Sequence, residues 1–210
     1  SLGVQRCWKG RLIDEMFPVQ GANLIDVACG TGDIGYRFIR AGGRHVHLCD
    51  SNKKMLEVGK SKLFDKSAKL FQQMSWNICN AENLPFEDEA FNYYSIAFGL
   101  RNVTDIDATL REAYRVLVNG GKFLCLELSP LDSVGLFSQI YDFYSFQVVP
   151  KIGRYVTKNE SAYLYLVESI RQFLKPECLQ KRIEVAGFQN VRYFRLTFGI
   201  ATIHVGYKRS

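Results

Sequence analysis

Short apolar runs alternate with amphipathic stretches along the first 130 residues of the chain. Runs of four to six residues have the length of buried strands, and this part of the sequence has five of them, at 23–28, 45–49, 76–79, 93–98 and 122–127. Strands that alternate with helices predict a parallel sheet that is covered on both faces.

Three helices are predicted between these runs. The first spans 33–40 and ends before Gly42-Gly43, and the second begins near Asn52 as its N-cap. The third spans 105–117, with Thr104 as the predicted cap. Its apolar side chains recur at helical spacing, at Ile106, Leu110, Ala113, Tyr114 and Leu117.

The C-terminal part follows a different pattern. A helix is predicted from Pro176 to Ala186, with Gly187 ending it, and strands follow at 191–197 and 201–208. The short Phe198-Gly199 turn between these strands requires an antiparallel pair. The predicted fold is therefore a Rossmann-like α/β domain, with a seven-stranded sheet of five parallel strands and a C-terminal antiparallel hairpin.

An insertion at 129–175 separates the fifth strand from the last helix, and no linker divides residues 1–210 into two domains. Residues 137–173 contain nine aromatic side chains, about double the 13% of the whole chain. We expect a helical, aromatic-rich cover over a ligand pocket, although the rings can also simply pack the insertion onto the sheet.

Composition excludes several classes of protein. Apolar residues make up 47% and charged residues 23% of the chain, as in ordinary globular domains, and no apolar run is long enough for a transmembrane helix. The net charge of +6 suits either an anionic membrane surface or an ordinary solvated surface, and no basic tract indicates nucleic acid. Six cysteines without a C-x-x-C pair predict a reducing compartment and no metal site.

A glycine-rich turn follows the first predicted strand, at 26–33 (DVACGTGD). Its glycines allow a ligand to approach the backbone, and the helix that follows offers unpaired N–H groups. Gly30, Gly32 and Gly35 also satisfy the dinucleotide fingerprint, with Asp50 twenty residues beyond Gly30 as the candidate ribose-binding acid. The turn alone therefore fits either a nicotinamide cofactor or S-adenosylmethionine.

The segment after the third predicted strand favours S-adenosylmethionine. Residues 80–86 (NAENLPF) resemble the methyltransferase segment that binds adenine. This pattern is not expected at this place in a dehydrogenase. Asn80 is alternatively a turn residue, and Asp50 is alternatively a solvated loop residue.

The chain resembles the ubiquinone/menaquinone biosynthesis C-methyltransferase family over nearly its whole length. The matching segments include 26–33, 49–56, 80–86, 98–105, 115–129, 141–146, 161–171 and 199–206, of which 98–105 and 161–171 are much more specific than the glycine turn. The sequence departs from the family at Gln5, Cys29 and Val118-Asn119, and it lacks the family's N-terminal Tyr-Asp-x-Met-Asn segment.

The resemblance implies a class I methyltransferase that binds S-adenosylmethionine and needs no metal. The implied cofactor-binding residues are Asp26, Gly30, Thr31, Gly32, Asp50, Asn80, Ala81 and Ala97, of which Ala97 can offer only its backbone.

The implied reaction is C-methylation of a polyprenylated benzoquinol or naphthoquinol. Arg101 and Asn102 follow the fourth predicted strand, at the edge where ligands bind in such sheets, and we expect them to be catalytic. Arg101 would stabilise the charge on the quinol oxygen and Asn102 would hold the hydroxyl, although both residues can instead anchor the loop. Arginine stays protonated and is a poor base.

Other polar and aromatic residues are weaker candidates. The candidate substrate wall consists of Tyr141, Tyr144, Tyr165 and Arg171. Glu168 is a candidate ion-pair partner of Arg171 or Arg101, and His204 is expected to be a core residue.

A polyprenylated substrate resides in a bilayer, so we expect peripheral contact with the inner membrane, from the bacterial cytoplasm or the mitochondrial matrix. The resemblance also suggests a homodimer or a quinone-biosynthesis complex. The alternatives are a methyltransferase for another aromatic or lipid substrate, an NAD-dependent reductase, and a scaffold without activity.

Overall fold

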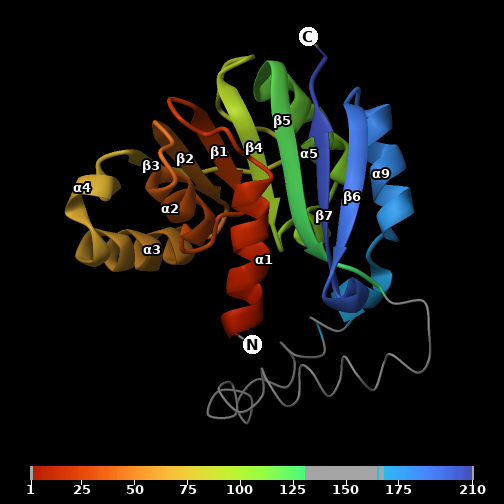
Figure 1. The fold of residues 1–210 in the computed structure, drawn as a ribbon, viewed down its shortest axis with the longest axis horizontal. Helices are drawn as coiled ribbons and strands as arrows, with labels where there is room; N and C mark the ends of the chain where they lie inside the picture. Colours follow the sequence, from red (N-terminus) through yellow and green to blue (C-terminus); the bar gives the residue numbers. More distant parts are fainter. Residues whose placement is uncertain (1, 131–164, 166–167, 210) are drawn as a thin grey trace.

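A seven-stranded sheet forms the centre of the computed structural model, which describes residues 2–130, 165 and 168–209 (Figure 1). The strands are β1 (Asn23–Val27), β2 (His45–Asp50), β3 (Met74–Ile78), β4 (Phe91–Ala97), β5 (Leu117–Leu128), β6 (Gln189–Leu196) and β7 (Ala201–Tyr207). Their order is β3-β2-β1-β4-β5-β7-β6, and only β7 runs antiparallel to its neighbours. The predicted α/β fold with a C-terminal antiparallel hairpin is confirmed.

Six α-helices with both ends among the described residues accompany the sheet. They are α1 (Leu2–Asp14), α2 (Asp33–Arg40), α3 (Lys53–Lys66), α4 (Ala68–Phe71), α5 (Ile106–Val116) and α9 (Pro176–Val185). Asn52 caps α3 as predicted, because its side-chain oxygen accepts hydrogen bonds from the amides of Lys54 and Met55. Gly187, with φ +106°, follows the last turn of α9.

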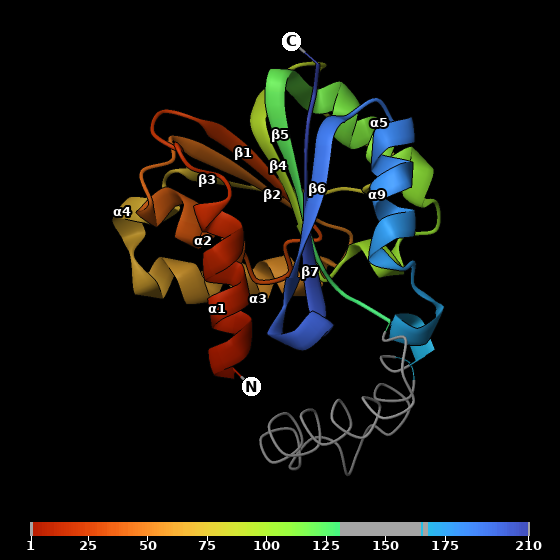
Figure 2. The same ribbon diagram turned by 45° about the vertical axis from the view of Figure 1, so that its right-hand side comes forward.

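The helices cover the two faces of the sheet, and each face has its own apolar cluster (Figure 2). Leu12 of α1 and Phe38 of α2 lie in one cluster, whereas Leu110 of α5 and Ile183 of α9 lie in the other. Side chains of a strand alternate between these clusters because successive residues point to opposite faces. Along β5, for example, Phe123 and Cys125 lie in the α5–α9 cluster, and Leu124 and Leu126 lie in the α1–α2 cluster.

Three local predictions need correction. Asp105 rather than Thr104 caps α5, because its carboxylate accepts a hydrogen bond from the Ala108 amide. Strand β3 begins at Met74, two residues before the predicted run, since pairing with β2 extends it. The Asn119-Gly120-Gly121 sequence predicts a turn, but these residues lie inside β5 as an irregularity, where the register against β4 shifts.

Helix α1 lies in a stretch for which the sequence pattern gives no prediction. Gly3 and Gly10 lower the helix propensity of this stretch. The helix is stabilised instead by burial of Trp8, Leu12 and Ile13 in the α1–α2 cluster.

Most of the predicted insertion lies outside the described residues, so its helical character stays a prediction. Residues 168–172, near its end, are helical. Within the described part of the chain, no helix is long and apolar enough to cross a membrane.

Candidate active site

A cavity of about 200 Å³ lies where β1 and β4 end and α2 begins. It is lined by Lys9, Asp26, Ala28, Cys29, Gly30, Thr31, Asp33, Ile34, Met55, Ala97 and Phe98. Four of the predicted cofactor residues, Asp26, Gly30, Thr31 and Ala97, are therefore brought together. The carboxyl ends of parallel strands are where open α/β sheets bind ligands.

The glycine turn is shaped by left-handed backbone. Gly30 has φ +57° and Gly32 has φ +76°, conformations that side chains disfavour. A Cβ atom at Gly32 would lie 3.1 Å from Leu48 and from Trp76, so this glycine allows close packing against the sheet rather than lining the cavity. Gly30 leaves more space, with only the Met55 methyl group 3.5 Å away.

Asp50 holds this turn from the end of β2. Its Oδ2 accepts a hydrogen bond from the Gly30 amide at 2.8 Å, and its Oδ1 accepts one from the Asn52 amide at 2.8 Å. A carboxylate has about four acceptor positions, so each oxygen can still accept a ligand hydroxyl. These two hydrogen bonds fit the predicted role of Asp50 as the ribose-binding acid, and they show that Asp50 is not a loosely solvated loop residue.

Asp26 is the buried acid of the cavity. It is 1% exposed, and its Oδ1 accepts a hydrogen bond from the Ser95 hydroxyl at 2.7 Å, whereas its Oδ2 has no partner. Burial raises the pKa of Asp26 to about 7, against the lowering effects of the Ser95 hydrogen bond and the nearby Lys9 charge. A cationic ligand group would satisfy Oδ2.

Replacing Asp26 with asparagine is expected to stabilise the protein at pH 8. The folded protein keeps a proton on Asp26 that the unfolded chain loses above about pH 4, so this group lowers the unfolding free energy as the pH rises from about 4 to about 7. The variant should gain up to about 4 kcal/mol at pH 8, and the gain should vanish near pH 4. Urea unfolding from pH 4 to pH 8 measures it, and a difference that does not change with pH would contradict it.

Outside the glycine-rich turn at 26–33, sequence reasoning missed four lining residues of this cavity: Lys9, Ile34, Met55 and Phe98. Lys9 comes from α1, and its Nζ lies 3.1 Å from Asp33 Oδ2. Burial alone would raise the pKa of Asp33, but Lys9 and then Arg37 hold it below its ordinary value. Because α1 is not predicted from the pattern, nothing in the sequence places Lys9 beside the glycine turn.

Asn80 and Ala81 do not line this cavity. Asn80 is exposed, and its Oδ1 accepts a hydrogen bond from the Glu82 amide at 3.0 Å, which makes it a turn residue in this structure. Their predicted contact with adenine remains a prediction.

A second cavity, of about 480 Å³, lies beside the predicted catalytic turn. Its described lining residues are Arg101, Ile106, Tyr165, Glu168, Ser169, Gln172, Phe173 and Leu174. Asn102 joins it through Tyr165, whose hydroxyl donates to Asn102 Oδ1 at 3.3 Å. Arg171 is exposed on the helical stretch 168–172 and is not among these lining residues, while Tyr141 and Tyr144 lie outside the described residues.

Arg101 is held by a buried carboxylate that the sequence analysis does not single out as a site residue. Its Nη1 pairs with Glu127 Oε1 and also donates to the Phe98 carbonyl oxygen at 2.9 Å. Glu127, at the end of β5, is 0% exposed and also accepts hydrogen bonds from the Arg101 and Leu128 amides. Burial raises the pKa of Glu127, and Arg101 opposes this shift. Among the described carboxylates, Glu127 rather than Glu168 is the ion-pair partner of Arg101.

Phe98 connects the two cavities. Phe98 lines the cavity at the glycine turn, and its backbone carbonyl oxygen accepts the hydrogen bond from Arg101. Behind it, a Cβ atom at Gly99 would lie 2.3 Å from the Ala28 Cβ, so the turn after β4 packs directly on the glycine turn after β1. The predicted cofactor and catalytic residues are therefore next to each other.

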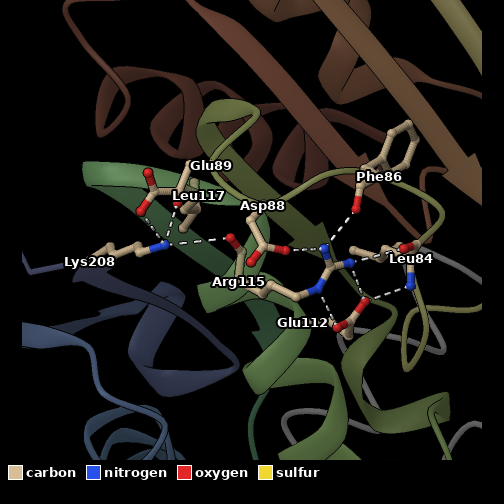
Figure 3. A network of polar contacts seen from close by, with 8 residues as sticks. All are labelled: Leu84, Phe86, Asp88, Glu89, Glu112, Arg115, Leu117 and Lys208. Carbon is tan, nitrogen blue, oxygen red and sulfur yellow. Dashed lines mark hydrogen bonds and ion pairs between the residues drawn. The ribbon is translucent and has the colours of Figure 1, made fainter.

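A polar network fixes the segment that follows β3 (Figure 3). Arg115 of α5 donates to the carbonyl oxygens of Leu84 and Phe86 at 3.0 and 2.7 Å, and it pairs with Asp88 and Glu112. Glu112 in turn accepts a hydrogen bond from the Leu84 amide at 2.7 Å. The hydrogen bond to Glu112, more than the one to Asp88, raises the pKa of Arg115 further above its ordinary value.

His204 is a core residue, as expected. It is 0% exposed, its Nε2 lies 2.9 Å from the Pro176 carbonyl oxygen, and burial lowers its pKa to about 4. Cys49, Cys79 and Cys125 are also buried. The described residues contain no group of three or more side chains that could hold a metal ion.

Known proteins have sequences similar to this chain over nearly its whole length. The model of the ubiE/COQ5 methyltransferase family matches residues 1–208. The chain is 44% identical to the mitochondrial 2-methoxy-6-polyprenyl-1,4-benzoquinol methylase of Bos taurus, covering 99% of this chain and 73% of that protein. It is 45% identical to the ubiquinone/menaquinone biosynthesis C-methyltransferase UbiE of Brucella abortus (strain S19), covering 99% and 78%.

A solved structure supports the fold. Phosphoethanolamine N-methyltransferase 2 of Haemonchus contortus, in complex with S-adenosyl-L-methionine, superposes with a TM-score of 0.70 at 15% identity, over 96% of this chain and 52% of that one. The family match decides between the two cofactor classes that the glycine turn leaves open, in favour of a methyltransferase rather than a reductase. The chain belongs to the ubiE/COQ5 methyltransferase family.

Proposed function

We propose that this chain transfers the methyl group of S-adenosylmethionine to a ring carbon of a polyprenylated quinol, in ubiquinone or menaquinone biosynthesis. The observation that carries the proposal is the junction at Phe98, which lines the cavity of the glycine turn and also binds Arg101 of the second cavity. One relative named a benzoquinol methylase and one named a ubiquinone/menaquinone biosynthesis C-methyltransferase, each covered over more than two thirds of its length, support the substrate class.

The first cavity, together with Asp50 beside it, fits S-adenosylmethionine. The free Oδ2 of Asp26 suits the ammonium of its methionyl part, and the remaining acceptor positions of Asp50 suit ribose hydroxyls. The N-terminus of α2 offers a positive dipole end to the carboxylate. When bound there, the cofactor supplies an electrophilic methyl group.

Arg101 and Asn102 would act on the quinol from the second cavity. Arg101 stays protonated, so it stabilises a phenolate rather than removing the proton. Its pairing with Glu127 fixes the guanidinium at the cavity wall, and Asn102 can hold the ring hydroxyl beside Tyr165. A phenolate raises electron density on the neighbouring ring carbon, which is the atom to be methylated.

The apolar part of the second cavity's lining suits the tail of a prenylated ring. Ile106, Phe173 and Leu174 line it, and each buried methylene of a tail contributes about 0.8 kcal/mol. Tyr141, Tyr144, Tyr165 and Arg171 remain the proposed substrate wall. We also propose that the protein contacts the inner membrane peripherally, and that it acts as a homodimer or within a quinone-biosynthesis complex.

Methyl transfer from labelled S-adenosylmethionine tests the function. We expect label in the ring of 2-methoxy-6-polyprenyl-1,4-benzoquinol, of demethylmenaquinol, or of both, and heat on titration with S-adenosylmethionine but not with NADH. Cofactor binding without transfer to either quinol would leave a methyltransferase for another aromatic or lipid substrate, or a scaffold. Heat from NADH alone would restore the reductase alternative.

Peripheral membrane contact predicts binding to lipid vesicles. With a net charge of +6, the protein should co-sediment more with vesicles that contain anionic phospholipid than with neutral vesicles, and salt should weaken this binding. Equal sedimentation with and without either kind of vesicle would rule the contact out.

A further inference from the structure

The segment 80–88, which carries the proposed adenine-binding residues, is attached to α5 at two separate places. The first attachment is the Arg115–Glu112 network, which holds Leu84 and Phe86 near the C-terminal end of α5 (Figure 3). The second attachment lies at the other end of the helix and is made by Glu82.

Glu82 binds the backbone that leads into α5. Its Oε1 accepts hydrogen bonds from the amides of Thr104 and Asp105, at 2.7 and 3.1 Å. Thr104 is two residues after Asn102 and three after Arg101, so the Glu82 carboxylate binds the backbone just after the proposed catalytic turn. Bonds from two amides to one carboxylate are charge-assisted and stronger than neutral hydrogen bonds.

Glu82 also belongs to the proposed adenine site. Its own amide donates to Asn80 Oδ1 at 3.0 Å, in the turn that carries Asn80 and Ala81. A continuous chain of hydrogen bonds therefore runs from the Asn80 side chain, through Glu82, to the backbone that follows Arg101 and Asn102. A cofactor that contacted Asn80 would therefore touch one end of this chain, and the start of α5 forms its other end.

We propose that Glu82 is a positioning residue that couples occupancy of the adenosine site to the placement of the Arg101–Asn102 turn. The proposal rests on the proposed function, because it assigns adenosine to the 80–88 segment and catalysis to the 101–102 turn. Arg115 anchors the same segment away from that turn, so it stabilises the segment without this coupling.

Substitutions separate coupling from simple stabilisation. Glu82→Ala should weaken S-adenosylmethionine binding about tenfold, and it should also lower the single-turnover rate of methyl transfer about tenfold when both substrates are saturating. Glu82→Gln keeps an oxygen acceptor and should recover part of both losses. Arg115→Met should lower the melting temperature but keep the saturated rate within twofold of wild type.

Glu87→Ala is the matched control, because Glu87 is an exposed acid on the same segment. It should behave as wild type. A wild-type saturated rate in a folded Glu82→Ala protein, or the same loss of rate in Arg115→Met, would overturn the coupling.

Amide NMR tests the coupling without catalysis. S-adenosylhomocysteine added to the wild-type protein should shift the resonances of Gly30, which reports occupancy through Asp50, and of Thr104 and Asp105. In Glu82→Ala the Gly30 shift should persist at saturation, whereas the other two should largely disappear. Equal shifts in both proteins, or a Gly30 shift alone in the wild type, refute the inference, while failure of the wild type to methylate quinols refutes only the proposed function.

Discussion

Replacing Arg101 with alanine is expected to lower the turnover of methyl transfer by about 100- to 1,000-fold, with S-adenosylmethionine affinity kept within a fewfold of wild type. Arg101 lines the second cavity and does not line the cavity at the glycine turn, so its loss removes a fixed positive charge beside the quinol oxygen. Loss of one such donor at a developing oxyanion costs about 10²–10³ in rate. Single-turnover kinetics and calorimetric titration with the cofactor measure the two quantities.

The control for this variant must account for Glu127. Removing Arg101 alone leaves a buried carboxylate unpaired, which destabilises a protein by about 3–5 kcal/mol. The double variant Arg101→Leu with Glu127→Leu removes both charges, and we expect it to fold better than the single variant while remaining as slow. Near-normal turnover in the double variant would show that Arg101 only anchors its loop. Arg40→Ala, which changes an exposed arginine on α2, is a second control. If Arg101→Ala lost no more rate than Arg40→Ala, the same conclusion would follow.

Replacing Asp50 with alanine is expected to weaken S-adenosylmethionine binding by about 100-fold, which corresponds to about 2.7 kcal/mol. The change removes the proposed ribose acceptor and also releases the Gly30 and Asn52 amides, so the glycine turn loses its fixed position. Hydrogen bonds to a charged group contribute about 1.5–3 kcal/mol each. Calorimetric titration of the variant gives the dissociation constant.

Asp50→Asn gives the matched comparison. Asparagine can still accept the Gly30 hydrogen bond but carries no charge, so its affinity should lie between wild type and Asp50→Ala. Quinol methylation at saturating cofactor should stay near wild type in both variants, because Asp50 does not line the second cavity. A dissociation constant unchanged in Asp50→Ala would remove the ribose contact from the proposed site.

Sequence patterns predict the first half of this fold because its signals are local. The first helix after the glycine turn spans Asp33–Arg40 as expected, and Asn52 caps α3, since a cap and a glycine stop act within a few residues. The bounds of β3 depend instead on pairing with β2, and α1 forms because the α1–α2 cluster buries its apolar side chains despite two glycines. Such tertiary effects have no signature in a single segment.

The same distinction applies to the site. The glycine turn, Asp50 and the Arg101–Asn102 turn can be located from motifs, because each motif follows a predicted strand. The pairing of Arg101 with Glu127 joins residues 26 positions apart, and it depends on which face of β5 the glutamate occupies. Lys9 reaches the cavity from a helix that the pattern does not predict. Glu82 belongs to the recognisable segment 80–86, but only the structure shows that its carboxylate accepts hydrogen bonds from the backbone that leads into α5.

Strand β7 is the last element of the chain, yet it lies inside the sheet between β5 and β6. During synthesis, β5 therefore has no partner on this side until β7 leaves the ribosome some 70 residues later. Until then its unpaired apolar edge is exposed to aggregation or to binding by chaperones. A stop after residue 200 removes the whole of this strand and leaves β6 with no strand beside it. Nascent chains of this protein should for that reason become protease-resistant in one step, only after β7 has left the ribosome.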